Sequence, residues 1–191
     1  MAITMSEPLV LRDRHWAVED LAELPTDDGN RYEIIDGVLV VSGAPRMRHQ
    51  RAVKRLCRIL DDACPNGLEV FIAPFGVVLR FDTMIMPDVL VARVADLTEG
   101  ELPAPPMLAV EVLSPGSRII DLEMKFKRFE RAGTPSYWVV DPNEDPKKAR
   151  LIAWDLDDHG VYQRVADVEG TDAFAAALPY PVRVVPADLV R

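Results

Sequence analysis

The chain has 191 residues, enough for a compact domain with a hydrophobic core, and its 49% hydrophobic and 28% charged residues are typical of a globular protein. No apolar run approaches the roughly 20 residues of a membrane span, and the N-terminal residues lack a signal-peptide pattern. The net charge of −9 argues against a protein that coats nucleic acid non-specifically. Two cysteines, Cys57 and Cys64, make no disulfide framework. We expect a cytoplasmic protein, with no membrane contact, in which residues 1–191 form a single domain.

Basic residues gather in two stretches although the chain is acidic overall. The second stretch covers residues 125–131, and the first contains no acid. This distribution is compatible with a local basic surface on an otherwise acidic protein, and also with an ordinary solvated helix face. The first stretch comprises Arg46, Arg48, Arg51, Lys54, Arg55 and Arg58.

The N-terminal part of the chain predicts a short helix followed by a β-hairpin. Residues 15–24 favour the helix, with Trp16 as a candidate packing anchor. Residues 32–41 form two apolar runs on either side of Asp36-Gly37. An Asp-Gly pair between such runs is a strong signal for a two-residue hairpin turn.

A longer helix is predicted over residues 45–63. Its apolar residues recur at positions i, i+3, i+4 and i+7, which places them on one buried stripe. His49 lies one turn before that stripe, so we expect His49 on the inward side of the N-terminal end. The stripe comprises Val53, Leu56, Cys57 and Leu60.

The middle of the chain predicts several strands. Residues 68–81 contain two strand-like runs, and residues 87–92 form a short strand. Residues 107–113 are almost wholly apolar and rich in β-forming residues, which is typical of a central strand buried on both faces. Glu111 interrupts this apolar run.

A second helix is predicted from Arg118 to about Ala132, with Ser117 as its N-cap and Gly133 as its stop. The expected apolar stripe of this helix comprises Ile119, Leu122, Phe126 and Phe129. Three further strands follow, the last two pairing across a turn at residues 157–160. They cover residues 137–140, 151–154 and 161–165. This order of elements indicates an α/β fold with a mixed sheet.

A carboxylate inside a continuous apolar strand needs a compensating group. Burial of Glu111 is costly unless the carboxylate is neutralised, paired or bound to a metal. Asp88 follows Pro87 at the start of another strand, and two carboxylates at neighbouring strand ends can converge on one cation. Oxygen ligands of this kind suit Mg²⁺ or Mn²⁺, and Glu33 could supply a third carboxylate. A structural ion pair is the alternative.

Lys125 is the possible fourth member of this group. It follows Leu122 by three residues and precedes Phe129 by four, so it lies beside the buried stripe of the second helix. Its amine could reach the end of the sheet there. It could equally extend into solvent and pair with Asp121 at position i−4.

The order and spacing of several segments resemble one protein family. The sequence is similar to the Uma2 family, which is assigned to the PD-(D/E)xK restriction-endonuclease-like nucleases. The matching positions are residues 31–37, His49, residues 87–88, residues 110–117, Asp121, Lys125 and residues 132–142.

The resemblance implies a restriction-endonuclease-like α/β core, with a central mixed β-sheet flanked by α-helices. It also implies a metal ion on Asp88 and Glu111, and catalytic roles for Glu33 and Lys125. The usual (D/E)xK pattern would place a lysine at position 113, where this chain has Leu113. The resemblance therefore implies that the lysine comes from the following helix, as Lys125.

The implied activity is hydrolysis of phosphodiester bonds in DNA with Mg²⁺ or Mn²⁺ as cofactor. Lys125 would orient the attacking water or offset developing negative charge. His49 could contact phosphate, or it could be a hydrogen-bonded structural histidine. Because many nucleases of this superfamily pair to cut two strands, we also expect a homodimer.

Two other functions fit the same residues. The acidic net charge is compatible with a nucleic-acid-binding or regulatory module that uses a nuclease fold without cleaving. A structural homodimer, in which the acids form ion pairs, is the other.

Overall fold

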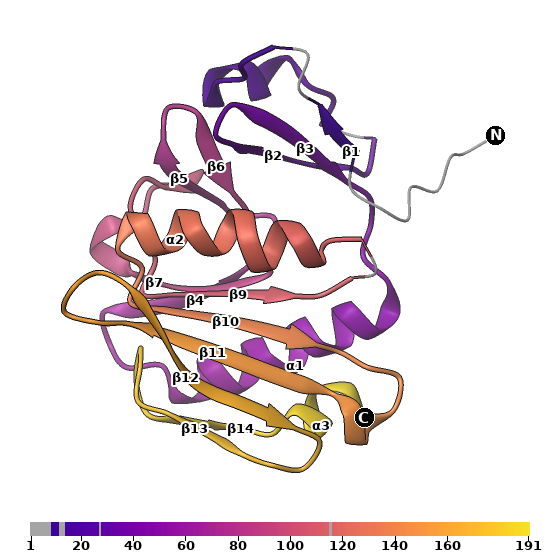
Figure 1. The fold of residues 1–191 in the computed structure, drawn as a ribbon. Coiled ribbons are helices and arrows are strands. Elements are labelled where there is room, and N and C mark those ends of the chain that lie inside the picture. The colour runs from indigo at the N-terminus through magenta and orange to yellow at the C-terminus, as the bar shows by residue number, and fades with distance from the viewer. Residues whose placement is uncertain (1–8, 12–13, 27, 115) are drawn as a thin grey trace.

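The computed structural model describes residues 9–11, 14–26, 28–114 and 116–191. Within these residues the strands form two six-stranded sheets and one two-stranded sheet. The helices lie against the sheets (Figure 1). The expected mixed α/β fold is confirmed, but a second large sheet accompanies the central one. Hydrophobic periodicity reports which residues are buried, and it does not report how many sheets the strands form.

The first sheet contains the predicted hairpin. Asp36 and Gly37 have φ angles of 54° and 72°, as a tight hairpin turn between right-twisted strands requires. Trp16 is 8% exposed and packs in one cluster with Ile34 and Leu39 of the hairpin. The expected first helix is only the short 3-10 segment η1 (Val18–Glu23). In spatial order this sheet comprises β1 (Leu9–Leu11), β3 (Val38–Ser42), β2 (Arg31–Ile35), β6 (Thr83–Ile85), β5 (Gly76–Arg80) and β8 (Glu101–Leu102).

The second sheet is the central mixed sheet. Strand β9 runs parallel to β10 and antiparallel to β7, and all five of its residues are buried. This confirms the central strand expected around Glu111. The order of the sheet is β12 (Tyr162–Glu169), β11 (Arg150–Leu156), β10 (Ser136–Asp141), β9 (Leu108–Val112), β7 (Val89–Arg93) and β4 (Leu68–Ile72). Smaller elements are β13 (Phe174–Ala176), β14 (Val182–Val184), η2 (Val94–Asp96) and η4 (Pro146–Lys148).

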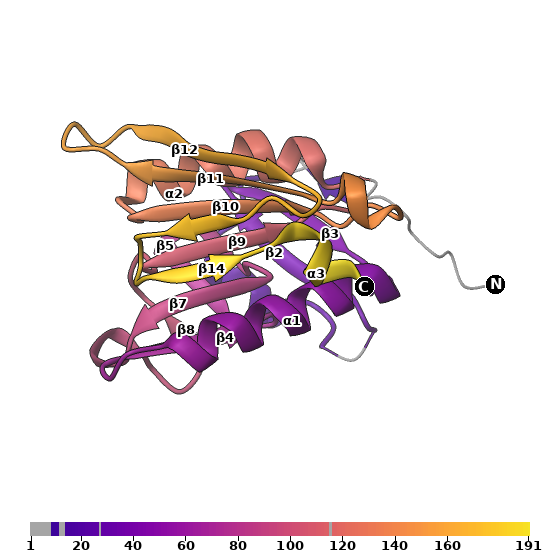
Figure 2. The ribbon, with the colours of Figure 1, turned by 90° about the horizontal axis from the view of Figure 1, so that it is seen from below.

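Helices cover both faces of the second sheet (Figures 1 and 2). Helix α1 (Met47–Ala63) and the short α3 (Pro186–Val190) lie on one face, where Leu56 and Leu60 pack in one core with Trp138. The expected stripe is confirmed except at Cys57, which is only half-buried, while the fully buried Ala52 completes it. Helix α2 (Phe126–Ala132) lies on the other face, between the two sheets (Figure 1).

The helical turn before α2 is wider than an α-helix. The segment η3 (Ile120–Lys125) is a π-helix, and the whole helical segment ends at Gly133, whose φ of 82° lies in the left-handed region. Ile119 is 68% exposed, whereas Ile120 is 8% exposed, so the expectation that Ile119 is buried is wrong. The extra residue in a π turn moves the buried face along by one position.

Ser117 keeps only part of its predicted role at the start of this helix. Its backbone carbonyl accepts a hydrogen bond from the N–H of Asp121, at 2.9 Å, as the carbonyl of an N-cap residue does. Its hydroxyl accepts from the backbone N–H of Ser114, at 3.0 Å, and not from an N–H group inside the helix. Within the described residues, no helix is long and apolar enough to cross a membrane.

Replacing Leu56 by alanine should lower the free energy of unfolding by about 2–5 kcal/mol, because this fully buried side chain fills the contact between α1 and the second sheet. Lys54→Ala, on the exposed side of the same helix, should change it by no more than about 0.5 kcal/mol. Urea denaturation followed by circular dichroism measures both. Equal losses in the two variants would contradict the packing of α1.

Candidate active site

An open cleft of about 1370 Å³ lies where the N-terminal end of α1, the start of β2 and the loop after β9 come together. Its walls include charged and apolar side chains from parts of the chain that are distant in sequence. The ionisable side chains that line it and lie close together are those of Arg31, His49, Asp88, Glu111 and Asp121. The cleft therefore contains three of the site residues expected from the sequence.

The ends of β7 and β9 bring Asp88 and Glu111 together. These strands are antiparallel with Val89 opposite Val110, so Asp88 and Glu111 occupy the next positions of the same register. The Oδ2 atom of Asp88 also accepts the backbone N–H of Val112, at 2.8 Å. This bond holds the Asp88 carboxylate against the end of β9.

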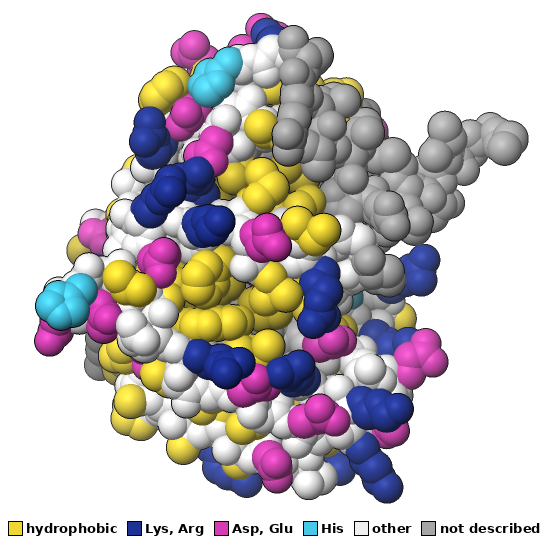
Figure 3. Space-filling model, viewed as in Figure 1, with side chains coloured by type: hydrophobic (Ala, Val, Ile, Leu, Met, Phe, Trp, Pro, Cys, Tyr) yellow, Lys and Arg dark blue, Asp and Glu magenta, His cyan; other side chains and the backbone are white. Residues whose placement is uncertain are grey.

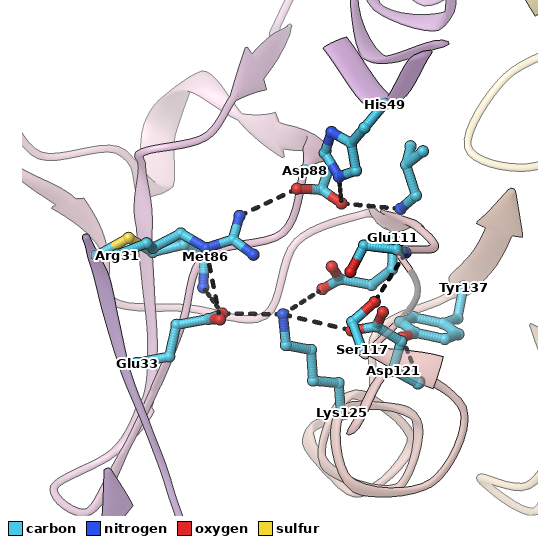
Figure 4. Close-up of polar contacts among 12 residues, drawn as sticks. Arg31, Glu33, His49, Met86, Asp88, Glu111, Ser117, Asp121, Lys125 and Tyr137 are labelled. Atoms are coloured by element: carbon cyan, nitrogen blue, oxygen red, sulfur yellow. Dashed lines mark hydrogen bonds and ion pairs between the residues drawn. The ribbon is translucent and has the colours of Figure 1, made fainter. Parts of the chain in front are cut away.

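Two side chains from other elements complete the environment of Asp88 (Figure 4). Nη1 of Arg31 lies 3.0 Å from Oδ1 of Asp88, and Nε2 of His49 lies 3.0 Å from Oδ2. Burial raises the pKa of Asp88, but the hydrogen bond from His49 and the charge of Arg31 outweigh burial and hold this pKa well below its usual range. Asp88 is therefore a carboxylate at neutral pH.

Lys125 is enclosed by three acids (Figure 4). Its Nζ atom lies 2.9 Å from Oε1 of Glu33, 3.1 Å from Oε1 of Glu111 and 3.7 Å from Oδ1 of Asp121. The side chain is only 1% exposed, so the alternative in which Lys125 extends into solvent is wrong, although the pairing with Asp121 is present. Burial lowers the pKa of Lys125, but the surrounding carboxylates reverse this shift, and the amine keeps its charge.

Glu33 is fully compensated in this arrangement. Its Oε1 atom accepts a hydrogen bond from the backbone N–H of Met86, at 2.8 Å, and forms an ion pair with Lys125. Nε of Arg31 lies 3.6 Å from Oε2. Burial raises the pKa of Glu33, yet the charges of Lys125 and Arg31 bring this pKa below its ordinary value. Glu33 and Lys125 are buried behind the cleft lining and are not part of it.

Glu111 is less well compensated. Its Oε1 lies close to Lys125 Nζ but outside hydrogen-bonding geometry, and this buried oxygen has no other protein partner in the described structure. Burial raises the pKa of Glu111 well above its usual value, and Lys125 opposes this shift only in part. Burial likewise raises the pKa of Asp121 to about 6. Lys125 carries a positive charge in the cluster, and Glu111 is the carboxylate that an added cation would stabilise most.

The residues fit a hard divalent cation with an incomplete protein shell. Within the described part of the chain, no group of three or more acidic, histidine or cysteine side chains is arranged to hold a metal by itself. Mg²⁺ is commonly bound through one or two carboxylates, with water and phosphate oxygens completing the coordination. Asp88 and the undercompensated Glu111 provide two such carboxylates at the cleft.

Two members of the site were not proposed from the sequence as functional residues. Arg31 precedes Glu33 by two residues on β2, so both side chains point to the same side of the strand. This alternation is the feature of the sequence that could have placed Arg31 in the site. Asp121 was considered only as a partner of Lys125. The hydroxyl of Tyr137 donates to the backbone carbonyl of Asp121, at 2.7 Å, and so fixes the π-helical turn to the sheet.

Replacing Lys125 by methionine should lower the free energy of unfolding by about 3–5 kcal/mol, because three buried carboxylates lose their shared cation. Lys127→Met, on the exposed face of the same helix, is the matched control and should be nearly neutral. Denaturant titration in EDTA measures both free energies. A loss below 1 kcal/mol, on the order of a surface substitution, would show that Lys125 is not the central cation of this cluster.

Comparison with known proteins places the chain in a family. No curated protein matches the chain. A crystal structure from Anabaena variabilis ATCC 29413, described as that of a putative nuclease belonging to DUF820, aligns with a TM-score of 0.68 at 15% identity, over 92% of this chain and 97% of that chain. This similarity shows a shared fold. The family Uma2, described as "Putative restriction endonuclease", matches residues 18–184, and the chain therefore belongs to the Uma2 family.

Proposed function

We propose that this protein is a Mg²⁺- or Mn²⁺-dependent endonuclease that hydrolyses phosphodiester bonds in DNA. The observation that carries the proposal is the meeting of Asp88 and Glu111 at an open cleft, where Glu111 lacks a full set of compensating groups. Membership of a family described as "Putative restriction endonuclease" supports nuclease activity. The metal, the DNA substrate and the catalytic residues belong to the proposal.

Asp88 and Glu111 are the residues that would hold the ion. A divalent ion bound there would polarise a phosphoryl oxygen and lower the pKa of a coordinated water. Arg31 and His49 orient the Asp88 carboxylate through contacts of 3.0 Å each. Because those contacts come from β2 and α1, the carboxylate is fixed before substrate arrives, and little reorganisation is needed during reaction.

Lys125 acts through Glu111 in this proposal. Its amine is buried behind the cleft lining and contacts Glu33 and Glu111, so it holds the Glu111 carboxylate at the cleft. It is therefore a positioning residue whose positive charge also lowers the cost of negative charge nearby. His49 contacts Asp88 through Nε2, and its Nδ1 is buried, which favours an orienting role over a phosphate contact.

Basic side chains on the cleft walls would contact the DNA backbone. Arg46, Arg48 and Arg118 line the cleft. Arg48 pairs with Glu144, and Arg118 lies 3.4 Å from Asp141. Acidic and basic side chains are also interspersed on the face shown in Figure 3. We therefore propose that phosphate contacts are local to the cleft and few, in keeping with the net charge of −9.

Cleavage of DNA substrates should require Mg²⁺ or Mn²⁺ and should fall about 100-fold or more in Glu111→Gln, since even the loss of an outer partner of a metal ligand costs about 10–100-fold. Glu69→Gln, at an exposed position of β4 outside the cleft lining, is the control and should retain activity. Equal activity in wild type and Glu111→Gln would indicate a contaminating nuclease and remove the assignment.

Arg46→Ala should weaken DNA binding to a similar degree for all sequences and reduce the slope of log affinity against log salt by about 1. Arg58→Ala should leave the slope unchanged, because Arg58 lies outside the cleft lining and pairs with Asp62. Fluorescence anisotropy in EDTA at several salt concentrations measures both slopes. Binding that does not respond to salt would exclude phosphate contacts.

A second candidate function is a nucleic-acid-binding module without cleavage. The enclosure of Lys125 and the lack of a ready three-ligand group within the described residues favour it. It predicts DNA binding that persists in Glu111→Gln together with no turnover by wild type under any divalent metal. The cytoplasmic location and the homodimer stay predictions from the sequence.

A further inference from the structure

The charged side chains of the candidate active site alternate in sign along a connected path (Figure 4). Arg31 lies between Asp88 and Glu33, with Nη1 3.0 Å from Asp88 Oδ1 and Nε 3.6 Å from Glu33 Oε2. Lys125 lies between Glu33 and Glu111, at 2.9 and 3.1 Å. The path therefore begins at Asp88, ends at Glu111, and has a basic side chain between each successive pair of acids.

The two ends of this path face each other without such a bridge. The register of β7 and β9, in which Val89 is opposite Val110, continues to place Asp88 opposite Glu111. Among the described residues, no lysine or arginine forms an ion pair with both of them. Of the three places at which a cation could join two acids of the path, two are filled by protein side chains. Between Asp88 and Glu111, which both line the cleft, the described residues supply no such side chain, and an added ion could take that place.

The numbers of acidic and basic side chains also favour a single added ion. The cluster contains four carboxylates, those of Glu33, Asp88, Glu111 and Asp121, and two basic side chains, those of Arg31 and Lys125. The acids therefore outnumber the lysine and arginine side chains by two. One divalent ion offsets this difference, whereas a second would place further positive charge among side chains that are only 1–3% exposed, where uncompensated charge is strongly unfavourable.

We infer that the site binds a single divalent cation, between Asp88 and Glu111, and that Arg31 occupies the place where a second cation would bridge Asp88 and Glu33. The inference rests on the proposed metal site. The guanidinium suits this position because it stays charged at any working pH, donates a hydrogen bond to Asp88 and forms an ion pair with Glu33. Glu33 then positions Arg31 and Lys125 and is not a ligand of the ion.

Calorimetric titration of the metal-free protein with Mn²⁺ tests the inference by stoichiometry. Wild type should bind one ion per chain. Arg31→Gln, which removes the charge, should bind two, and Arg31→Lys, which keeps it, should bind one. Glu33→Gln should also keep one ion per chain. Circular dichroism of each metal-free variant verifies that it is folded.

The outcomes separate the inference from the function on which it rests. Two ions per wild-type chain would overturn the inference and leave the metal site standing, and this measurement needs no variant. One ion in folded Arg31→Gln would overturn the role of Arg31. If wild type gives no binding heat and Asp88→Asn is indistinguishable from it, the proposed metal site itself fails. One ion in wild type and two in Arg31→Gln support the inference.

Discussion

The buried ammonium group of Lys125 is the interaction on which the candidate active site depends. Its three acidic partners come from different parts of the fold: Glu33 from β2 of the first sheet, Glu111 from β9 of the second sheet, and Asp121 from the π-helical turn. One cation thus joins both sheets and the helix between them. Because each acid is almost fully buried, the positive charge of this shared partner offsets part of the cost of removing its carboxylate from water.

The π-helical turn makes this placement possible. In the segment Ile120–Lys125 the wider turn buries Ile120, Asp121 and Lys125 together and leaves Ile119 exposed. The hydroxyl of Tyr137, from the neighbouring β10, donates to the carbonyl of Asp121 and stabilises the irregular turn. Single π turns inserted in α-helices are frequent at functional sites. Here the irregularity places a lysine and a carboxylate on the same buried side.

The basic stretch at the start of α1 serves two parts of the structure. Arg46 and Arg48 lie at the cleft, whereas Arg51 and Arg55 donate to the carbonyl oxygens of Val190 and Asp188 and hold α3 against α1. Neither a continuous basic surface nor a wholly solvated helix face describes this arrangement. An acidic protein can therefore present positive charge at one cleft while using similar residues to fix its C-terminal helix.

The sequence by itself determined the elements and the main acids. Apolar periodicity located α1 and β9, Asp36-Gly37 located the hairpin turn, and a carboxylate in an apolar run marked Glu111, because these signals depend on neighbours along the chain. Tertiary structure alone decided the contacts of Arg31 with Asp88, 57 residues away, and of His49 with Asp88, 39 residues away. It also decided that the strands form two large sheets and that the buried face of the second helical segment shifts by one residue. Local periodicity carries no information about which distant strands pair, and those pairings set the partners of every charged group in the site.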